Sequence, residues 1–344
     1  MIELKLHPLK LVLKKPFRIA HGTFHYREAL VVTLNTGDYT GYGEATVITY
    51  YGKTLNVFTK ILESNRSFIE NLSWTHPREF WQQLYPIFQH HPFILCALDV
   101  AAYDLWAKQK QAPLHQLWGL SLKNLPLTNF TISIDSVEKM WAQMKAFPNP
   151  IYKIKLGTKE DIAIIKALRK KTDALFRIDA NCAWSVQETL SNAAVFQSLG
   201  VEFIEQPLAK DNWEGMKILY QKSPLPIIAD ESCQIPSDVK KCHLHFHGIN
   251  IKLMKCGGIT PALKMIQQAK KLKMKVMCGC MTESSIGISA IGQLLPLLDY
   301  VDMDGALLLK NDPAEGVKIQ NGKIIYPNVN GHGGVLKKSK NYDY

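Results

Sequence analysis

The sequence predicts a closed α/β barrel that follows a smaller α+β domain. With 344 residues the chain is long enough for both. After residue 125, short apolar runs rich in β-branched residues recur at intervals of roughly 22–27 residues, and most gaps between them have helical patterns. Eight such runs at near-constant spacing favour a closed barrel over an open sheet. The expected strands lie near 129–133, 151–155, 175–179, 201–205, 226–229, 248–252, 275–279 and 301–305.

Residues 1–120 have a different pattern, typical of an α+β domain. LKLVLKKPF and EALVVTLNTGDYTGYGEA alternate like antiparallel strands, and the turn at 35–38 predicts a hairpin. From about Gly52 to Leu120 the apolar residues take helical spacing, as in FILCALDVAAYDLWAKQKQ. We therefore assign 1–120 to this domain and 121–309 to the barrel. The polar, Gly-rich segment 310–344 is expected to return to the first domain.

Composition narrows the class of protein. The chain is 47% hydrophobic and 21% charged, as in an ordinary globular protein, and it has no apolar window near the ~18 residues that a membrane span needs. MIELKLHPLKLVLKKPF lacks the continuous apolar core of a signal peptide, so we expect a cytoplasmic protein. The net charge of +11 comes from dispersed lysines, so nucleic-acid binding is not expected. The cysteines lack disulfide or zinc spacing, and Cys278 and Cys280 are expected in the core.

Three carboxylates stand at the C-terminal ends of three consecutive predicted strands. They are Asp179 in FRIDAN, Glu205 in FIEQP and Asp230 in IIADES. Catalytic groups of α/β barrels come from these strand ends, and neighbouring strands are only about 4.8 Å apart. Each acid alone could cap a helix or form a salt bridge, but three in register predict a divalent cation, and Mg²⁺ fits best. Asn181 and Glu231 are expected to support these ligands.

Lysines flank the carboxylates along the sequence. Lys153 and Lys155 are two apart on one strand, so both point into the barrel, where lysine is rarely buried without a partner or a function. Two neighbouring ammonium groups beside a metal are expected to lower each other's pKa, as a general base requires. Lys252 comes from the sixth strand, roughly across the barrel from the second, although it could instead form a structural ion pair with Asp230 or Glu231. Lys255 falls past the strand end, and we prefer Lys252.

Asp302 and Asp304, in YVDMDGALLL, share a face at the end of the eighth strand. Paired buried acids need a cation, and a substrate ammonium would suit them. A turn or a salt bridge with a barrel lysine is the alternative.

The order KxK, then D, E and D on successive strands, then NIKLMKCGG, resembles the enolase superfamily, muconate-lactonising subgroup. PFRIAHGTF and GYGEAT resemble the loops of its capping domain. The resemblance implies a modified TIM barrel, (β/α)7β, with an N-terminal α+β capping domain. It also implies one Mg²⁺ per site and an enediolate intermediate. Its implied roles are metal binding by Asp179, Glu205 and Asp230, acid/base catalysis by Lys155 and Lys252, and charge stabilisation by Lys153.

Asp302-Met303-Asp304 resembles the Asp-x-Asp motif of dipeptide epimerases such as the L-Ala-D/L-Glu type, where it binds the N-terminal ammonium. GCMTESSIG resembles the same branch and places Glu283 and Ser285 near the mouth of the barrel. The resemblance therefore implies a Mg²⁺-dependent epimerase that inverts the C-terminal α-carbon of a dipeptide.

One departure concerns the cap loop. The L-Ala-Glu type has an arginine after the PF segment, and this chain has Gly22 there. Either another side chain replaces that arginine, or the second residue of the dipeptide is not glutamate. The candidates for replacement are His21, His25, Arg27 and Lys53. Phe24, Tyr50 and Tyr51 would suit an apolar side chain instead.

Two further classes stay open. N-acylamino acid racemisation, o-succinylbenzoate synthesis and muconate cycloisomerisation belong to the same subgroup, but their substrates lack the free ammonium for which Asp302 and Asp304 are expected. A non-catalytic, basic binding protein on a barrel scaffold is the remote alternative. The expected partner is a small dipeptide, and a homo-oligomer is compatible with a barrel of this size.

Overall fold

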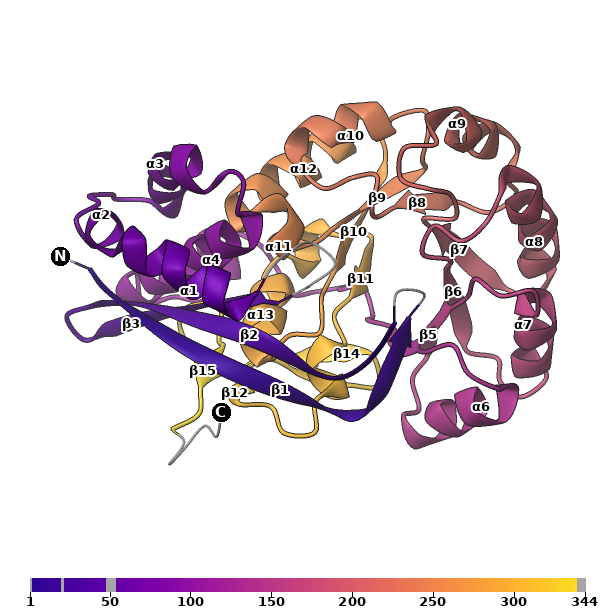
Figure 1. The fold of residues 1–344 in the computed structure, drawn as a ribbon, viewed down its shortest axis with the longest axis horizontal. Coiled ribbons are helices and arrows are strands. Elements are labelled where there is room, and N and C mark those ends of the chain that lie inside the picture. Colours follow the sequence, from indigo (N-terminus) through magenta and orange to yellow (C-terminus); the bar gives the residue numbers. More distant parts are fainter. Residues whose placement is uncertain (1, 20–21, 48–53, 339–344) are drawn as a thin grey trace.

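The computed structural model describes residues 2–19, 22–47 and 54–338. Figure 1 shows a barrel with helices around it and a long antiparallel sheet extending from the N-terminal domain alongside it. The predicted architecture, a modified barrel with an α+β domain before it, is confirmed.

The N-terminal domain begins with three antiparallel strands in the order β1-β2-β3. These are β1 (Glu3–Ile19), β2 (Gly22–Thr36) and β3 (Tyr39–Thr46). Gly37, in the turn between β2 and β3, has a φ of 53°, which favours glycine and explains why the hairpin turns there. The helices that follow are α1 (Leu55–Ser64), α2 (Arg66–Glu70), α3 (Pro77–Phe88), α4 (Pro92–Gln109) and α5 (Leu114–Leu117).

Helix α4 packs directly against β3, and two glycines make this approach possible. A Cβ on Gly41 would clash with the carbonyl oxygen of Ala101, and a Cβ on Gly43 with that of Ala97. Helix α4 is buried on nearly all sides, so it forms the centre of the core between the sheet and the barrel.

Eight parallel strands form the barrel in the order of the sequence. They are β4 (Phe130–Ile132), β5 (Ile151–Lys155), β6 (Leu175–Asp179), β7 (Val201–Glu205), β8 (Ile227–Ala229), β9 (Gly248–Ile251), β10 (Lys275–Gly279) and β11 (Tyr300–Asp302). A bridge between Thr128 and Val301 brings the first and last strands together. Each strand lies at its predicted place, because its apolar run is bounded by turn residues and by an amphipathic helix.

The helices of the barrel lie outside the strands in Figure 1. They are α6 (Val137–Ala146), α7 (Asp161–Arg169), α8 (Val186–Ser198), α9 (Trp213–Lys222), α10 (Pro236–Cys242) and α12 (Ile259–Lys271). Shorter elements are α11 (Leu253–Cys256), α13 (Ser285–Gly292) and the 3₁₀ turns η2 (Leu295–Leu297) and η3 (Gly305–Leu308). No helix in the described ranges is long and apolar enough to cross a membrane.

The C-terminal segment contacts the N-terminal domain. Lys310 N donates to Val12 O at 2.7 Å, and His332 Nε2 lies 2.8 Å from Tyr42 O. The segment contains the short strands β12 (Ala314–Glu315), β13 (Lys318–Gln320), β14 (Lys323–Ile325) and β15 (Val335–Leu336).

Candidate active site

The strand register places the predicted metal ligands side by side. Lys155 is paired with Asp179 across β5 and β6, and Asp179 is paired with Glu205 across β6 and β7. Asp230 follows β8, the next strand in the sheet. The structure therefore places the three carboxylates at the ends of three consecutive, neighbouring strands, as the sequence predicted.

Lys153 lies among these carboxylates. Its Nζ is 2.9 Å from Asp179 Oδ2, 2.8 Å from Glu205 Oε2 and 2.9 Å from Asp302 Oδ2, and its side chain is 2% exposed. Burial would lower the pKa of this ammonium, but the surrounding carboxylates raise it well above its ordinary value. The carboxylates in direct contact with Lys153 therefore outweigh its burial in setting its pKa.

Lys155 lies at the end of β5 and binds Asp179. Its Nζ donates to Asp179 Oδ2 at 2.6 Å and to Asn181 Oδ1 at 3.1 Å. The backbone N–H of Asn181 donates to the other oxygen of Asp179 at 3.0 Å. Asn181 thus touches both a predicted metal ligand and a predicted catalyst.

Asp230 is shared by two lysines. Lys252 Nζ lies 2.9 Å from Oδ2, and Lys255 Nζ lies 2.5 Å from Oδ1. Burial would raise the pKa of Asp230, but Lys252 and Lys255 hold it far below its ordinary value. Burial would lower the pKa of Lys252, but the charge of Asp230 raises it above its ordinary value. Lys255 therefore belongs to the site although it stands past the strand end.

Asn250 is a site residue that the sequence reasoning missed. Its Nδ2 donates to Glu205 Oε1 at 2.9 Å, and it is fully buried. The sequence position of Asn250 indicates its place in the site, because it precedes Lys252 by two residues in an extended segment and therefore points to the same face. Glu231, expected to support the ligands, has a buried Oε2 without a hydrogen-bond partner among the described residues.

The site fits a divalent cation by its chemistry. Asp179, Glu205 and Asp230 offer the oxygen donors that Mg²⁺ prefers. Glu205 Oε2 is buried and accepts no hydrogen bond from the described residues, although Lys153 lies close by. Burial and the charge of Asp179 raise the pKa of Glu205 to about 7. A cation beside these oxygens would relieve this repulsion and lower that pKa.

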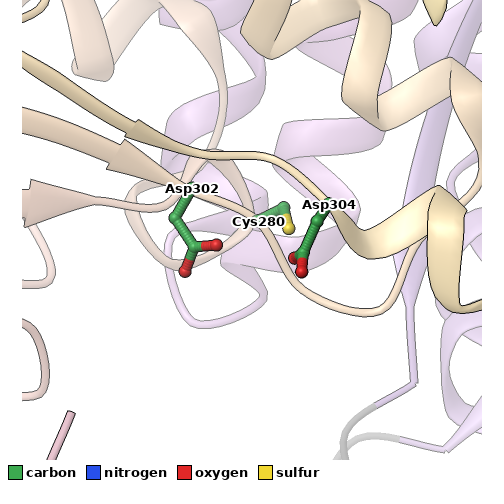
Figure 2. A group of neighbouring side chains, drawn as sticks. All are labelled: Cys280, Asp302 and Asp304. Carbon is green, nitrogen blue, oxygen red and sulfur yellow. The ribbon is translucent and has the colours of Figure 1, made fainter. Parts of the chain in front are cut away.

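Asp302 and Asp304 form a second acidic group beside the first. Figure 2 shows their carboxyl groups beside the thiol of Cys280, and ligand atoms of the three lie within 4.8 Å of one another. Asn129 Nδ2 donates to Asp302 Oδ1 at 2.7 Å, and the backbone N–H of Thr131 donates to Asp304 Oδ2 at 2.6 Å.

The two acids differ in ionisation. Burial and the charge of Asp302 raise the pKa of Asp304 to about 7. For Asp302, burial is outweighed by Lys153, and the pKa is lowered. Cys278 is buried as predicted, whereas Cys280 is only partly buried and lies against this acidic pair.

Two of the cap-loop candidates, Phe24 and Arg27, lie against each other. The guanidinium of Arg27 lies over the ring of Phe24, 3.4 Å from its centre, and Gly22 begins β2. His25 is exposed. The remaining candidates, His21, Tyr50, Tyr51 and Lys53, lie outside the described residues.

Glu283 and Ser285 lie at the start of α13. Glu283 is buried and accepts a hydrogen bond from the backbone N–H of Met281 at 2.8 Å. Burial raises the pKa of Glu283 well above its ordinary value. Ser285 Oγ donates to Asp312 Oδ2 at 2.6 Å, so its hydroxyl is engaged with the C-terminal segment.

A cavity of about 190 Å³ lies where the cap strand β1 meets the barrel. Thr131, one of its lining residues, bonds Asp304, and Ser133 follows β4 next to the end of β5. The walls are mostly apolar, and two lysines of β1 contribute to them. The lining residues are Lys14, Lys15, Pro16, Phe130, Thr131, Ser133, Gln143, Phe147, Leu307 and Leu308.

Two family models match the chain. Residues 1–119 match the mandelate racemase / muconate lactonizing enzyme N-terminal domain, and residues 135–340 match the enolase C-terminal domain-like family. Among similar proteins, an L-Ala-D/L-amino acid epimerase of Flavobacterium johnsoniae is 51% identical and covers 97% of this chain and 100% of its own. A hydrophobic dipeptide epimerase of Roseobacter litoralis is 33% identical over 97% of this chain and 99% of its own.

Solved structures agree with these matches. A substrate-liganded L-Ala-D/L-Glu epimerase from Bacillus subtilis superimposes with a TM-score of 0.92 at 27% identity, covering 98% of this chain and 99% of its own. A dipeptide epimerase from Enterococcus faecalis, complexed with Mg and L-Leu-L-Tyr, gives 0.90 at 30% identity, covering 97% and 99%. The chain therefore belongs to the mandelate racemase / muconate lactonizing enzyme family of the enolase superfamily.

Proposed function

We propose that this protein is a Mg²⁺-dependent dipeptide epimerase that inverts the α-carbon of the C-terminal residue. The single observation that carries the proposal is the placement of two lysines around one carboxylate cluster. Lys155 ends β5 and Lys252 follows β9, with three strands between them, and each lysine touches a different carboxylate of the cluster. A substrate carbon between them would have one ammonium or amine on each face.

Asp179, Glu205 and Asp230 would hold the metal. When bound, Mg²⁺ supplies positive charge that stabilises the second negative charge developed by the substrate carboxylate. Lys153, which touches two of these acids, adds a fixed positive charge at the same place.

Inversion then needs one proton transfer on each face of the carbon. One of the two lysines, as the neutral amine, takes the α-proton, and the other, as the ammonium, returns a proton from the opposite side. Asn181 orients Lys155, and Lys252 is oriented through Asp230. For the reverse reaction the two lysines exchange roles.

Asp302 and Asp304 support a substrate with a free N-terminal ammonium. An N-acylated amino acid carries no charge there and would leave both buried acids without that partner. The proposal therefore favours dipeptides over N-acylamino acids, o-succinylbenzoate precursors and muconate.

The cavity supports a large apolar side chain on the second residue. A cavity of about 150 Å³ lined by Leu, Ile and Phe can bind benzene, so about 190 Å³ has room for a ring. One of its lining residues, Ser133, follows β4 beside the end of β5, where Lys155 lies. Thr131, another lining residue, bonds Asp304, so a dipeptide held at Lys155 and Asp304 would lie close to this cavity.

The test is a dipeptide library incubated with the protein and Mg²⁺ in D₂O and read by mass spectrometry. We expect one deuteron at the α-carbon of the second residue, with the fastest exchange for large apolar side chains. Exchange should vanish when Lys155 and Lys252 are both changed to alanine. Exchange in N-acylamino acids but in no dipeptide would move the protein to racemisation, and no exchange in either would refute the proposal.

A further inference from the structure

Lys255 is a buried lysine that has no role in the proposed mechanism. Its side chain is 2% exposed, and its Nζ lies 2.5 Å from Asp230 Oδ1. It stands in α11, one turn after Lys252, and its backbone N–H donates to Lys252 O at 2.9 Å. The two lysines therefore reach the two oxygens of one carboxylate from one short, buried turn.

The carboxylates beside the two proposed catalysts have a common arrangement. Asp179 binds Lys155 and also Lys153, while Asp230 binds Lys252 and also Lys255. In each pair one lysine is a proposed proton carrier and the other is buried more deeply. Lys153 and Lys255 are each 2% exposed, compared with 11% for Lys155 and 12% for Lys252.

We propose that Lys255 is a positioning residue, which holds Asp230 in place while Lys252 is detached from it during proton transfer. The inference rests on the proposed epimerase function. Lys252 has to leave Asp230 to reach a substrate carbon, and Asp230 then loses one of the two side chains that fix the orientation of its carboxylate. The ammonium on Oδ1 keeps Asp230 paired and its orientation fixed.

Metal affinity separates positioning from simple charge balance. If Lys255 only balanced charge, its removal would make the site more negative, and Mg²⁺ would bind more tightly. If it orients Asp230, its removal disorders a metal ligand, and the loss of such supporting partners typically weakens metal binding about 10–100-fold. The two roles therefore predict opposite changes in Mg²⁺ affinity when Lys255 is removed.

The first experiment is calorimetric titration of Mg²⁺ into the full chain and into Lys255→Met and Lys255→Arg, with no dipeptide present. We expect at least tenfold weaker binding in Lys255→Met and recovery to within threefold in Lys255→Arg. Lys275→Met is the matched control, because Lys275 forms a 2.8 Å ion pair with Asp299 on the exposed surface. Unchanged or tighter binding in Lys255→Met would overturn the proposal. Circular dichroism establishes that each variant is folded.

The second experiment measures α-proton exchange in D₂O from each epimer separately, at saturating Mg²⁺. Lys155→Ala and Lys252→Ala identify which epimer each lysine serves. In Lys255→Met we expect at least a tenfold loss for the epimer served by Lys252 and less than a threefold change for the other. Equal losses for both epimers would contradict a role exerted through Asp230 and Lys252. If the unchanged protein exchanges no dipeptide, the epimerase function fails, and the Mg²⁺ titration still decides the role of Lys255.

Discussion

Lys153 and Asp302 form a buried ion pair of 2.9 Å that joins two parts of the site. The same Nζ contacts Asp179 and Glu205, so the proposed metal site and the proposed ammonium site share one cation. Asp302 therefore belongs to both parts of the site, whereas Asp304 accepts a hydrogen bond from the backbone N–H of Thr131. This difference makes the two aspartates separable by mutation.

Asp304→Asn should weaken substrate binding with little effect on the chemical step. It removes one charged partner of the substrate ammonium, a loss of about 2 kcal/mol or roughly thirtyfold in kcat/KM, carried mainly by KM. Asp302→Asn should lower kcat as well, because Lys153 loses one of its carboxylates. Steady-state kinetics with one dipeptide in both directions provides the measurement. Unchanged kcat/KM in both variants would refute ammonium binding by this pair.

The sequence predicted those parts of the site that depend on strand ends. Asp179, Glu205 and Asp230 could be placed because parallel strands bring their C-terminal ends to one edge, whatever the details of packing. Asn250 and Lys255 carry no comparable signal in the sequence. An amide in a buried strand has no characteristic spacing, and the helical turn that brings Lys255 back to Asp230 is too short to be recognised from sequence periodicity.

The ionisation of the lysines could not be predicted in the same way. Proximity of Lys153 to Lys155 in sequence implied mutual repulsion, but the pKa depends on which charges are nearest in space. Asp179, Asp302 and Glu205 contact Lys153 directly, and these contacts come from three other strands.

Removal of Mg²⁺ should abolish exchange without unfolding the protein. The lysines already pair with the acidic ligands, so the metal-free site keeps its charges compensated. We expect activity to disappear with a chelator and to return with excess Mg²⁺, while the far-UV circular dichroism is unchanged. At a free Mg²⁺ concentration of a hundred times Kd, the free energy of unfolding should increase by about 2.7 kcal/mol, and Tm should rise accordingly. Loss of secondary structure on chelation would show that the metal is needed for folding.

Gly43→Ala should destabilise the cap domain. A Cβ at this position would clash with the carbonyl oxygen of Ala97, a backbone atom of α4 that cannot rotate away. Forcing α4 and β3 apart typically costs about 1–3 kcal/mol. Urea unfolding of this variant measures the cost. Gly119→Ala serves as a comparison for backbone strain without a clash, because Gly119 has open space around its Cβ position but a φ of 67°. A Gly43→Ala protein as stable as the parent would contradict the close approach of α4 to β3.

His332 should make stability depend on pH. Its Nδ1 accepts the N–H of Gly334 at 2.9 Å, so its Nε2 carries the hydrogen and donates to Tyr42 O at 2.8 Å. Burial lowers the pKa of this ring below 6.5, despite the nearby Asp104. The unfolded chain therefore binds a proton on this ring at higher pH than the folded chain does. The contribution of His332 to the free energy of unfolding is thus present above pH 6.5 and is lost as the pH falls towards the pKa of the folded state. Between pH 7.5 and 5.5, the free energy of unfolding measured in urea should fall less in His332→Gln than in the parent. Equal decreases would show that His332 is not the group responsible.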